Sequence, residues 1–126
     1  MSWQDLVKSN LVGTGKVSKG AIIGFDGSVW GKSDDFNITE AETQAAVKGF
    51  SNRDGLLASG IKLEGDKYFV LQADEDRIIG KKESKGFFMY KTGQTVIIAT
   101  YKEGIQPEQC STAAGALADY FKGIGY

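Results

Sequence analysis

The run of residues 94–101 constrains the fold more than any other stretch, because it is the most continuously apolar and β-branched segment of the chain. Val96, Ile97 and Ile98 leave neither face of a strand clearly polar. A strand that is apolar on both faces needs cover on both sides, and this run is too short to span a membrane. The sequence therefore predicts a buried central strand, in a sheet that carries helices on both faces.

Shorter strand-like segments precede this run and are separated by brief turns. Strands at 19–25 and 28–32 predict a hairpin, because Asp26-Gly27 is a typical two-residue hairpin turn. The other segments predicted as strands are 61–63, 67–73, 77–82 and 87–91. Connections this short force neighbouring strands to be antiparallel, so these segments predict a meander.

Helices are predicted at both ends of the chain and once between the strands. Ser2, Thr39 and Pro107 mark the three starts, since the first two are capping residues and proline suits the first helical turn. The last helix should end at Gly123, whereas residues 51–60 predict a loop with at most one helical turn. The predicted fold class is therefore α+β, with a central antiparallel sheet.

Composition excludes several classes of function. The net charge of −1 argues against a dedicated nucleic-acid binder, and the absence of histidine removes histidine-activated nucleophiles and histidine metal sites. Cys110 is the only cysteine, which fits a reducing compartment, and the first residues lack the features of a signal peptide. We therefore expect one cytoplasmic domain over residues 1–126, in which chemistry based on lysine or carboxylate side chains remains open in principle.

Two short motifs resemble ligand-binding loops without completing them. Residues 13–16 (Gly-Thr-Gly-Lys) lack the first glycine of a phosphate loop and follow a predicted helix instead of a strand. Residues 74–76 (Asp-Glu-Asp) lack the glycine and the distal glutamate of a calcium loop. A turn that ends a helix and a solvated turn are the simpler interpretations.

The aromatic residues near the two ends of the chain allow two interpretations. Trp3, Trp30, Tyr120 and Tyr126 could simply fill the core. If the terminal helices lie side by side on the sheet, however, these side chains gather at one edge. Such a cluster is the kind of surface on which a polyproline helix docks.

Basic side chains are concentrated between residues 77 and 91. Against the single acid Glu83, this stretch holds Arg77, Lys81, Lys82, Lys85 and Lys91. A solvated edge is one interpretation, and a surface for an acidic protein or an anionic lipid headgroup is the other.

Several blocks occur in a characteristic order along the chain. Residues 1–4 (Met-Ser-Trp-Gln) are followed by 11–15 (Leu-Val-Gly-Thr-Gly), and Trp30 closes the first hairpin. Later blocks are 80–82, 91–94 and 118–120 with Tyr126. In these blocks and their spacing the sequence resembles the profilin family over essentially its whole length. The resemblance implies a central antiparallel sheet, with the two terminal helices on one face and smaller helices on the other.

The resemblance also implies three sets of binding residues. The polyproline-binding set is Trp3, Leu6, Trp30, Tyr120 and Tyr126, in which Leu6 replaces the usual tyrosine. The actin-binding set is Lys67, Phe69, Gln72, Lys82, Ile105, Gln106, Ser111, Thr112 and Gly115, in which Gln72 replaces a commonly basic residue. The phosphoinositide-binding set, taken from the basic stretch, is Lys81, Lys82, Lys85 and Lys91.

The implied function is that of a monomeric, cytoskeleton-associated protein in the cytoplasm. It would bind monomeric actin one to one, promote nucleotide exchange on actin and regulate polymerisation. It would not be an enzyme and would need no cofactor or metal. Its other partners would be phosphoinositides and proline-rich proteins such as formin-type actin assembly factors. Two alternatives stay open: a proline-motif adaptor with weak or no actin binding, suggested by Gln72, and a small-molecule sensor on a similar sheet.

Overall fold

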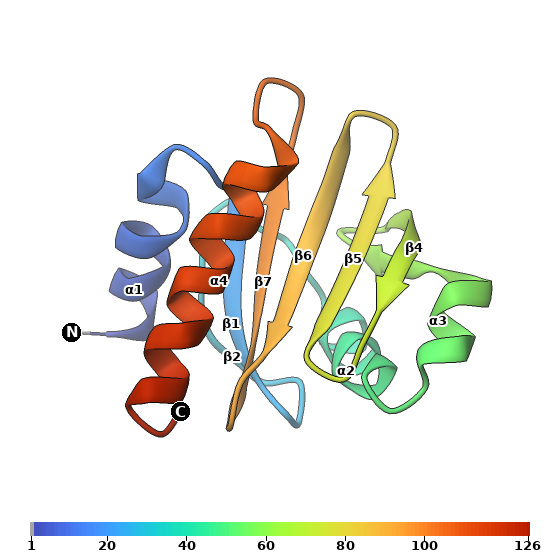
Figure 1. Cartoon of the computed structure of the whole chain (residues 1–126), viewed down its shortest axis with the longest axis horizontal. Helices are drawn as coiled ribbons and strands as arrows, with labels where there is room; N and C mark the ends of the chain where they lie inside the picture. The colour runs from blue at the N-terminus through green and yellow to red at the C-terminus, as the bar shows by residue number, and fades with distance from the viewer. Residues whose placement is uncertain (1) are drawn as a thin grey trace.

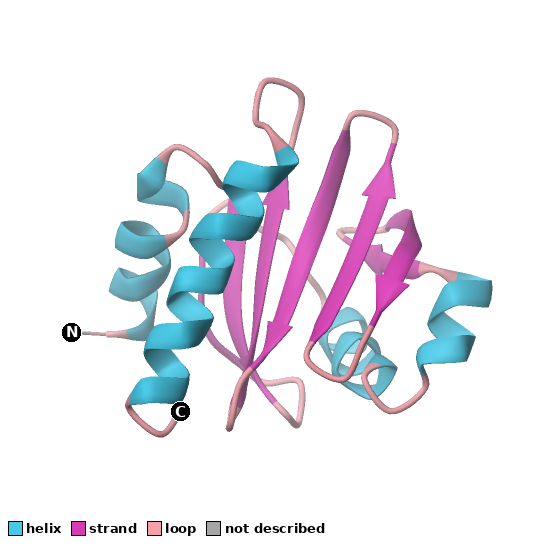
Figure 2. Cartoon of the chain, in the orientation of Figure 1, coloured by secondary structure: helices cyan, strands magenta, loops and turns pink. Residues whose placement is uncertain are grey.

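The computed structural model describes residues 2–126 and contains one antiparallel sheet in the order β2-β1-β7-β6-β5-β4-β3. Figure 2 shows these strands as a single twisted layer with the helices outside it. The strands are β1 (Lys19–Gly24), β2 (Val29–Lys32), β3 (Ile61–Leu63), β4 (Asp66–Ala73), β5 (Arg77–Lys82), β6 (Lys85–Lys91) and β7 (Thr95–Tyr101). The predicted meander and hairpin are both present, and β7 joins them.

Helices cover both faces of the sheet, as the sequence predicted. They are α1 (Trp3–Asn10), the short 3-10 helix η1 (Val12–Thr14), α2 (Glu40–Gly49), α3 (Arg53–Ser59) and α4 (Pro107–Gly123). The terminal helices α1 and α4 pack on one face, while α2 and α3 pack against the other face and the β3–β4 end. Figure 1 shows α4 lying across β7, with no helix in front of β4 and β5 on that side. We call this uncovered part of the sheet the open face.

Strand β7 is the centre of the structure, because all of its residues are buried. Val96 and Ile98 enter the core under α2, whereas Ile97 and Ala99 enter the core under α1 and α4. The absence of a polar face in the sequence therefore has a direct cause: each face of this strand lies in a different core. The prediction of a doubly covered central strand is confirmed.

The two predicted side-chain caps are also present. The Ser2 hydroxyl accepts from the Asp5 amide at 3.1 Å, and Thr39 and Glu42 form the reciprocal pair of a capping box. The Glu42 carboxylate also accepts from the amides of Glu64 and Gly65. One side chain thus caps α2 and fixes the turn between β3 and β4.

Three local predictions were wrong. The loop between β1 and β2 holds three residues, 25–27, and is not the two-residue Asp26-Gly27 turn, because the Gly24 amide donates to the Ser28 carbonyl and the Gly27 amide to the Gly24 carbonyl. Residues 53–59 form the helix α3 instead of a loop, and β6 begins at Lys85, two positions earlier than predicted. Helix α3 buries only Leu56, which packs on Gly49, so its sequence carries no apolar periodicity. Glu83 adopts a φ of 57°, and this tight turn lets pairing begin at Lys82 and Lys85. Within residues 2–126, no helix is both long enough and apolar enough to cross a bilayer.

Candidate functional site

Three aromatic side chains from distant parts of the sequence meet at the ends of α1 and α4, and a fourth, Tyr120, lies near them across Phe121. The ring centroid of Trp3 lies 4.9 Å from that of Trp30 and 5.1 Å from that of Tyr126, and it packs edge-on to the buried Phe121 at 5.6 Å. Tyr120 lies beside Phe121 and is 54% exposed. We call Trp3, Trp30, Tyr120 and Tyr126 the aromatic cluster.

The first helix is held against β2 by a close backbone approach. A side chain at Gly31 would meet the backbone of Trp3 at 2.7 Å, so only glycine lets α1 approach this closely. The side-chain amide of Gln4 donates to the Lys32 carbonyl and its oxygen accepts from the Lys32 amide. These contacts fix the position of Trp3 over Trp30 and make the cluster a rigid surface.

The last residues are held by the turn between β6 and β7. The Tyr126 main-chain oxygen accepts from the Gln94 amide at 2.5 Å and from the Thr92 hydroxyl at 2.7 Å. The Gln94 side chain donates to the Gly125 carbonyl at 3.0 Å. Because Tyr126 belongs to the cluster, the turn at 91–94 acts as a support for it. Residues 91–94 stood out in the sequence as a family block, but nothing in the sequence indicated that they hold Tyr126 in place.

Removing the Thr92 hydroxyl should therefore weaken the aromatic cluster. In Thr92→Val, we expect the affinity for decaproline to fall about fivefold, the effect of losing a hydrogen bond worth about 1 kcal/mol. Calorimetric titration measures this. Thr100→Val is the control for loss of a buried hydroxyl, since Thr100 donates to the main-chain oxygen of Lys19, away from the cluster. The Thr92 hydroxyl also bonds to Thr95 within its own turn, so thermal unfolding of both variants must show that they are folded. Equal losses in the two variants would refute the supporting role.

A groove between α1 and α4 continues from the aromatic cluster along the two helices. It has a volume of about 560 Å³. Leu6 and Tyr120 stand at the cluster end, and Asn10, Thr14, Lys16 and Thr112 line the other end. We call this the helix groove. Leu6 thus lies between the cluster and the groove, half-buried in the wall.

The open face holds Phe69 and Gln72, two of the residues implied for actin binding. Phe69 on β4 is 71% exposed and pairs across the strands with Lys81. Leu71, two residues further along the strand, is a second exposed apolar side chain on the same face. The β-bulge at Leu71 then shifts the register, so that Gln72 lies opposite Ile79. The Gln72 side chain donates to the Asp74 carboxylate at 2.6 Å. A basic residue in place of Gln72 would therefore pair with the Asp74 carboxylate, and its charge would be less available to a partner protein.

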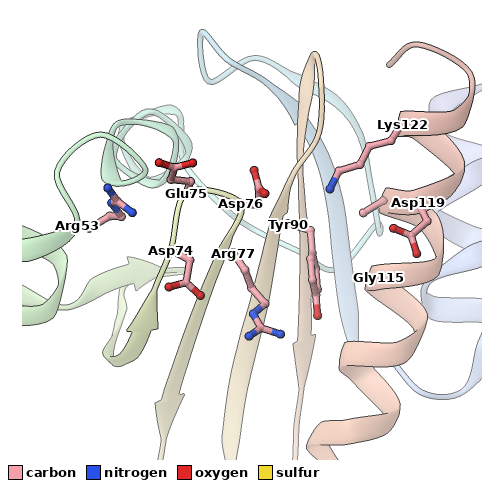
Figure 3. A pocket seen from close by; sticks show the side chains of 10 residues that line it. Arg53, Asp74, Glu75, Asp76, Arg77, Tyr90, Gly115, Asp119 and Lys122 are labelled. Atoms are coloured by element: carbon pink, nitrogen blue, oxygen red, sulfur yellow. The ribbon is translucent and has the colours of Figure 1, made fainter.

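Helix α4 borders the open face through Ser111 and Gly115. The Ser111 hydroxyl bonds to that of Tyr90 on β6 at 2.7 Å, and Gly115 lies above the same ring. Next to them is a charged recess of about 600 Å³, shown in Figure 3. Arg77 and Tyr90 project from the strands, Asp119 and Lys122 come from α4, and Asp74, Glu75 and Asp76 come from the turn at the far side. Sequence spacing gave no sign of this recess.

The remaining residues of the implied actin set are spread around the molecule. Ile105 and Gln106 lie just before α4, and Thr112 faces the helix groove. Lys67 lines a different recess, between α2, α3 and β3. Lys82 lies on the α2 side of the sheet, where its ammonium bonds to Asp66 at 3.0 Å. The structure therefore brings Phe69, Gln72, Ser111 and Gly115 to one face and separates Lys82 from them.

The implied phosphoinositide lysines are also divided. Lys82 and Lys85 both bond to Asp66, and Lys85 lies 5.7 Å from the Tyr68 ring centroid. The hydrogen bond from Lys85, followed by that from Lys82, lowers the pKa of Asp66. Lys81 points to the open face, and Lys91 is at the opposite end of β6, about 20 Å from Lys85 at 3.3 Å per residue. Lys91 does not belong to the same patch.

Cys110 is buried in the core under α1 and α4. Burial raises the pKa of the Cys110 thiol to about 12, so the thiol stays protonated at neutral pH. Among the described residues, no group of acids and Cys110 is arranged to hold a metal ion. Residues 74–76 thus remain a turn that lines the charged recess.

Comparison with known proteins identifies the family. The family model described as Profilin matches residues 1–126. Profilin-3 of Caenorhabditis elegans is 59% identical over 126 residues, which cover all of both chains. Among solved structures, Acanthamoeba castellanii profilin IA has a TM-score of 0.96 and 42% identity over 99% of this chain and 100% of that one. The chain belongs to the profilin family. A structure of mouse profilin IIa with a double repeat from the FH1 domain of mDia1 has a TM-score of 0.79, with 21% identity over the full length of both chains; at that identity it shows the shared fold.

Membership of the profilin family agrees with the observed architecture. The implied arrangement, with α1 and α4 on one face of an antiparallel sheet and smaller helices on the other, is the one found. The aromatic cluster includes Trp30 on the edge strand β2. The open face lies on the other side of α4, where Figure 1 shows β4 and β5 without a helix in front of them.

Proposed function

We propose that this profilin binds proline-rich peptides at the aromatic cluster and monomeric actin at the open face. It would act in the cytoplasm, associated with the cytoskeleton and without chemistry of its own. The observation that carries the proposal is the packing of Trp3 and Trp30 at 4.9 Å, with Tyr126 5.1 Å from Trp3. Rigid, partly exposed aromatic rings suit a polyproline helix, which has no internal hydrogen bonds and is already extended.

The support for a peptide ligand is physical and comparative. Indole and phenol groups offer large contact areas and hydrogen-bond donors to the unpaired carbonyls of an extended peptide. Mouse profilin IIa, which shares the fold, is solved with a double repeat from the FH1 domain of mDia1. We therefore propose formin-type assembly factors as partners of this chain.

The support for actin is the open face. Exposed Phe69 and Leu71 form an apolar centre, and the charged recess beside α4 adds cations and acids at its rim. An apolar centre with a polar rim is typical of protein interfaces. A protein that binds the nucleotide-open state of actin more tightly than the closed state raises the fraction of actin that is open. Nucleotide exchange on actin then becomes faster.

The experiment that tests this function uses the unaltered chain in two assays. Binding to polyproline resin tests the aromatic cluster, and release of a fluorescent nucleotide from actin monomers tests the open face. We expect retention on the resin and faster nucleotide release. Retention without any effect on actin would favour the proline-motif adaptor, which the bond between Gln72 and Asp74 keeps as a second candidate.

We also propose that phosphoinositide headgroups bind at Lys82 and Lys85, whereas Lys81, which points to the open face, lies outside this site. Two ammonium groups share one carboxylate there, so a positive charge remains for a phosphate. A basic group near an anionic membrane contributes about 1 kcal/mol, or roughly fivefold in affinity. The separation of Lys91 makes it a control within the same strand.

Lipid binding should therefore depend on Lys85 and not on Lys91. We expect Lys85→Gln to weaken sedimentation with vesicles containing phosphatidylinositol bisphosphate about fivefold at low salt. Lys91→Gln should leave it unchanged, and physiological salt should reduce binding of all variants. Equal effects of the two substitutions would mean that the basic stretch acts only as a diffuse solvated edge.

A further inference from the structure

The helix groove shares Tyr120 with the aromatic cluster and extends beyond it along α1 and α4. It opens at Leu6 and Tyr120, next to the cluster, and its middle is lined by Ala113, Ala116 and Leu117 on α4. These small and aliphatic side chains of α4 leave an apolar channel between α4 and α1. A volume of about 560 Å³ is within the range of ligand sites.

The end of the groove farthest from the cluster is polar and carries one charge. Lys16 lines it together with Asn10, and no acid lines the groove. Within residues 2–126, Lys16 takes part in no ion pair, and the Asn10 side chain makes no hydrogen bond. These groups offer donors to a ligand, and the charge suits an acidic one.

The groove is continuous with the cluster because of residue 6. Leu6 has no ring, so it leaves the passage from Tyr120 into the groove open. A peptide on the cluster can therefore continue between the helices. Tyr120 and Thr112 are about 12 Å apart along α4 at 1.5 Å per residue. An extended peptide covers that distance in about four residues at 3.1 Å each.

We propose that the helix groove binds the residues that flank the proline run of the ligand, and that an acidic residue about four positions from the run pairs with Lys16. The proposal rests on the proposed binding of proline-rich peptides and deepens it. It makes this chain select partners by the sequence beside their prolines. An aliphatic residue would occupy the channel, and a carboxylate would reach Lys16.

Calorimetric titration with synthetic peptides tests this selection. One peptide is decaproline, and two others carry Leu-Ser-Ser-Glu after the prolines or Glu-Ser-Ser-Leu before them, because an extended peptide can lie in either direction. We expect one extended peptide to bind about tenfold more tightly than decaproline. Replacing its Glu by Gln should remove two- to fivefold of that gain, the size of an exposed ion pair.

Protein variants connect the gain to the groove. Lys16→Gln should abolish the preference for Glu over Gln, while Lys48→Gln, an exposed lysine on α2, should keep it. Leu6→Tyr should bind decaproline at least as tightly as the unaltered chain but lose the gain from the extension, because the ring closes the passage. A preference for Glu that survives Lys16→Gln would overturn the proposal, as would extended peptides that bind no better than decaproline. Failure of decaproline itself to bind would instead contradict the proposed function.

Discussion

Trp3→Ala should lose most of the affinity for decaproline. Trp3 is the centre of the aromatic cluster, because it contacts Trp30, Tyr126 and the buried Phe121 at centroid distances of 4.9, 5.1 and 5.6 Å. Truncation of a central aromatic anchor costs about 2 kcal/mol or more, which is at least thirtyfold in affinity. Calorimetric titration is the suitable measurement, since the substitution also removes a fluorescent indole.

Two controls separate lost contact from lost structure. Trp3 is half-buried against the core under α1 and α4, so thermal unfolding must show that the variant is folded at the temperature of the titration. Phe25→Ala removes another aromatic ring, 44% exposed, which lies against Lys91 and next to Val47 of α2. We expect Phe25→Ala to bind decaproline normally. Unaltered binding in folded Trp3→Ala would place the ligand elsewhere.

The features predicted correctly from the sequence are those set by local chemistry or by strong patterns. The run at 94–101 has no polar face, and β7 has a core on each side of it. The capping roles of Ser2 and Thr39 follow from hydroxyl groups placed before helical segments, and both caps are present. Capping residues act on the next few residues of the chain, and the run at 94–101 is apolar on both faces of its strand. Both features can therefore be predicted without knowledge of the tertiary structure.

Side-chain direction near turns is a feature that the sequence could not give. Lys81 and Lys82 are chemically identical neighbours, yet Lys81 lies opposite Phe69 while Lys82 bonds to Asp66 on the other side of the sheet. Which of them faces the open side depends on strand register, and the bulge at Leu71 changes the register of β4 against β5. The separation of Lys91 likewise depends on where β6 begins.

Surfaces made by packing were also beyond sequence reasoning. The helix groove needs α1 and α4 side by side, and the charged recess combines the β4–β5 turn with the last turns of α4. Residues 91–94 stood out as a family block, but only the contacts of Thr92 and Gln94 with residues 125 and 126 show what they support. In each case the functional surface is defined by chain segments that are far apart in sequence.

Phe69→Ala should produce the largest loss of actin binding. Phe69 is 71% exposed at the centre of the open face, with Leu71 beside it and Lys81 across from it. A large exposed aromatic side chain has no evident role in stability, so its removal should leave the unfolding temperature nearly unchanged. If it is the anchor of the interface, the loss is about 2 kcal/mol or more, near thirtyfold in affinity for actin monomers. Fluorescence anisotropy with labelled actin measures this, and decaproline binding should stay intact.

The two neighbouring lysines provide a matched pair for the same surface. Lys81→Glu reverses a charge on the open face beside Phe69, whereas Lys82→Glu reverses one on the α2 side, next to Asp66. We expect Lys81→Glu to weaken actin binding by about tenfold, since a like charge at an interface with an acidic partner repels it. Lys82→Glu should have little effect on actin, although its repulsion from Asp66 should lower stability slightly. The opposite ranking would show that actin approaches the α2 side of the sheet, where Lys82 and Lys85 lie, and would make actin compete with lipid for that patch.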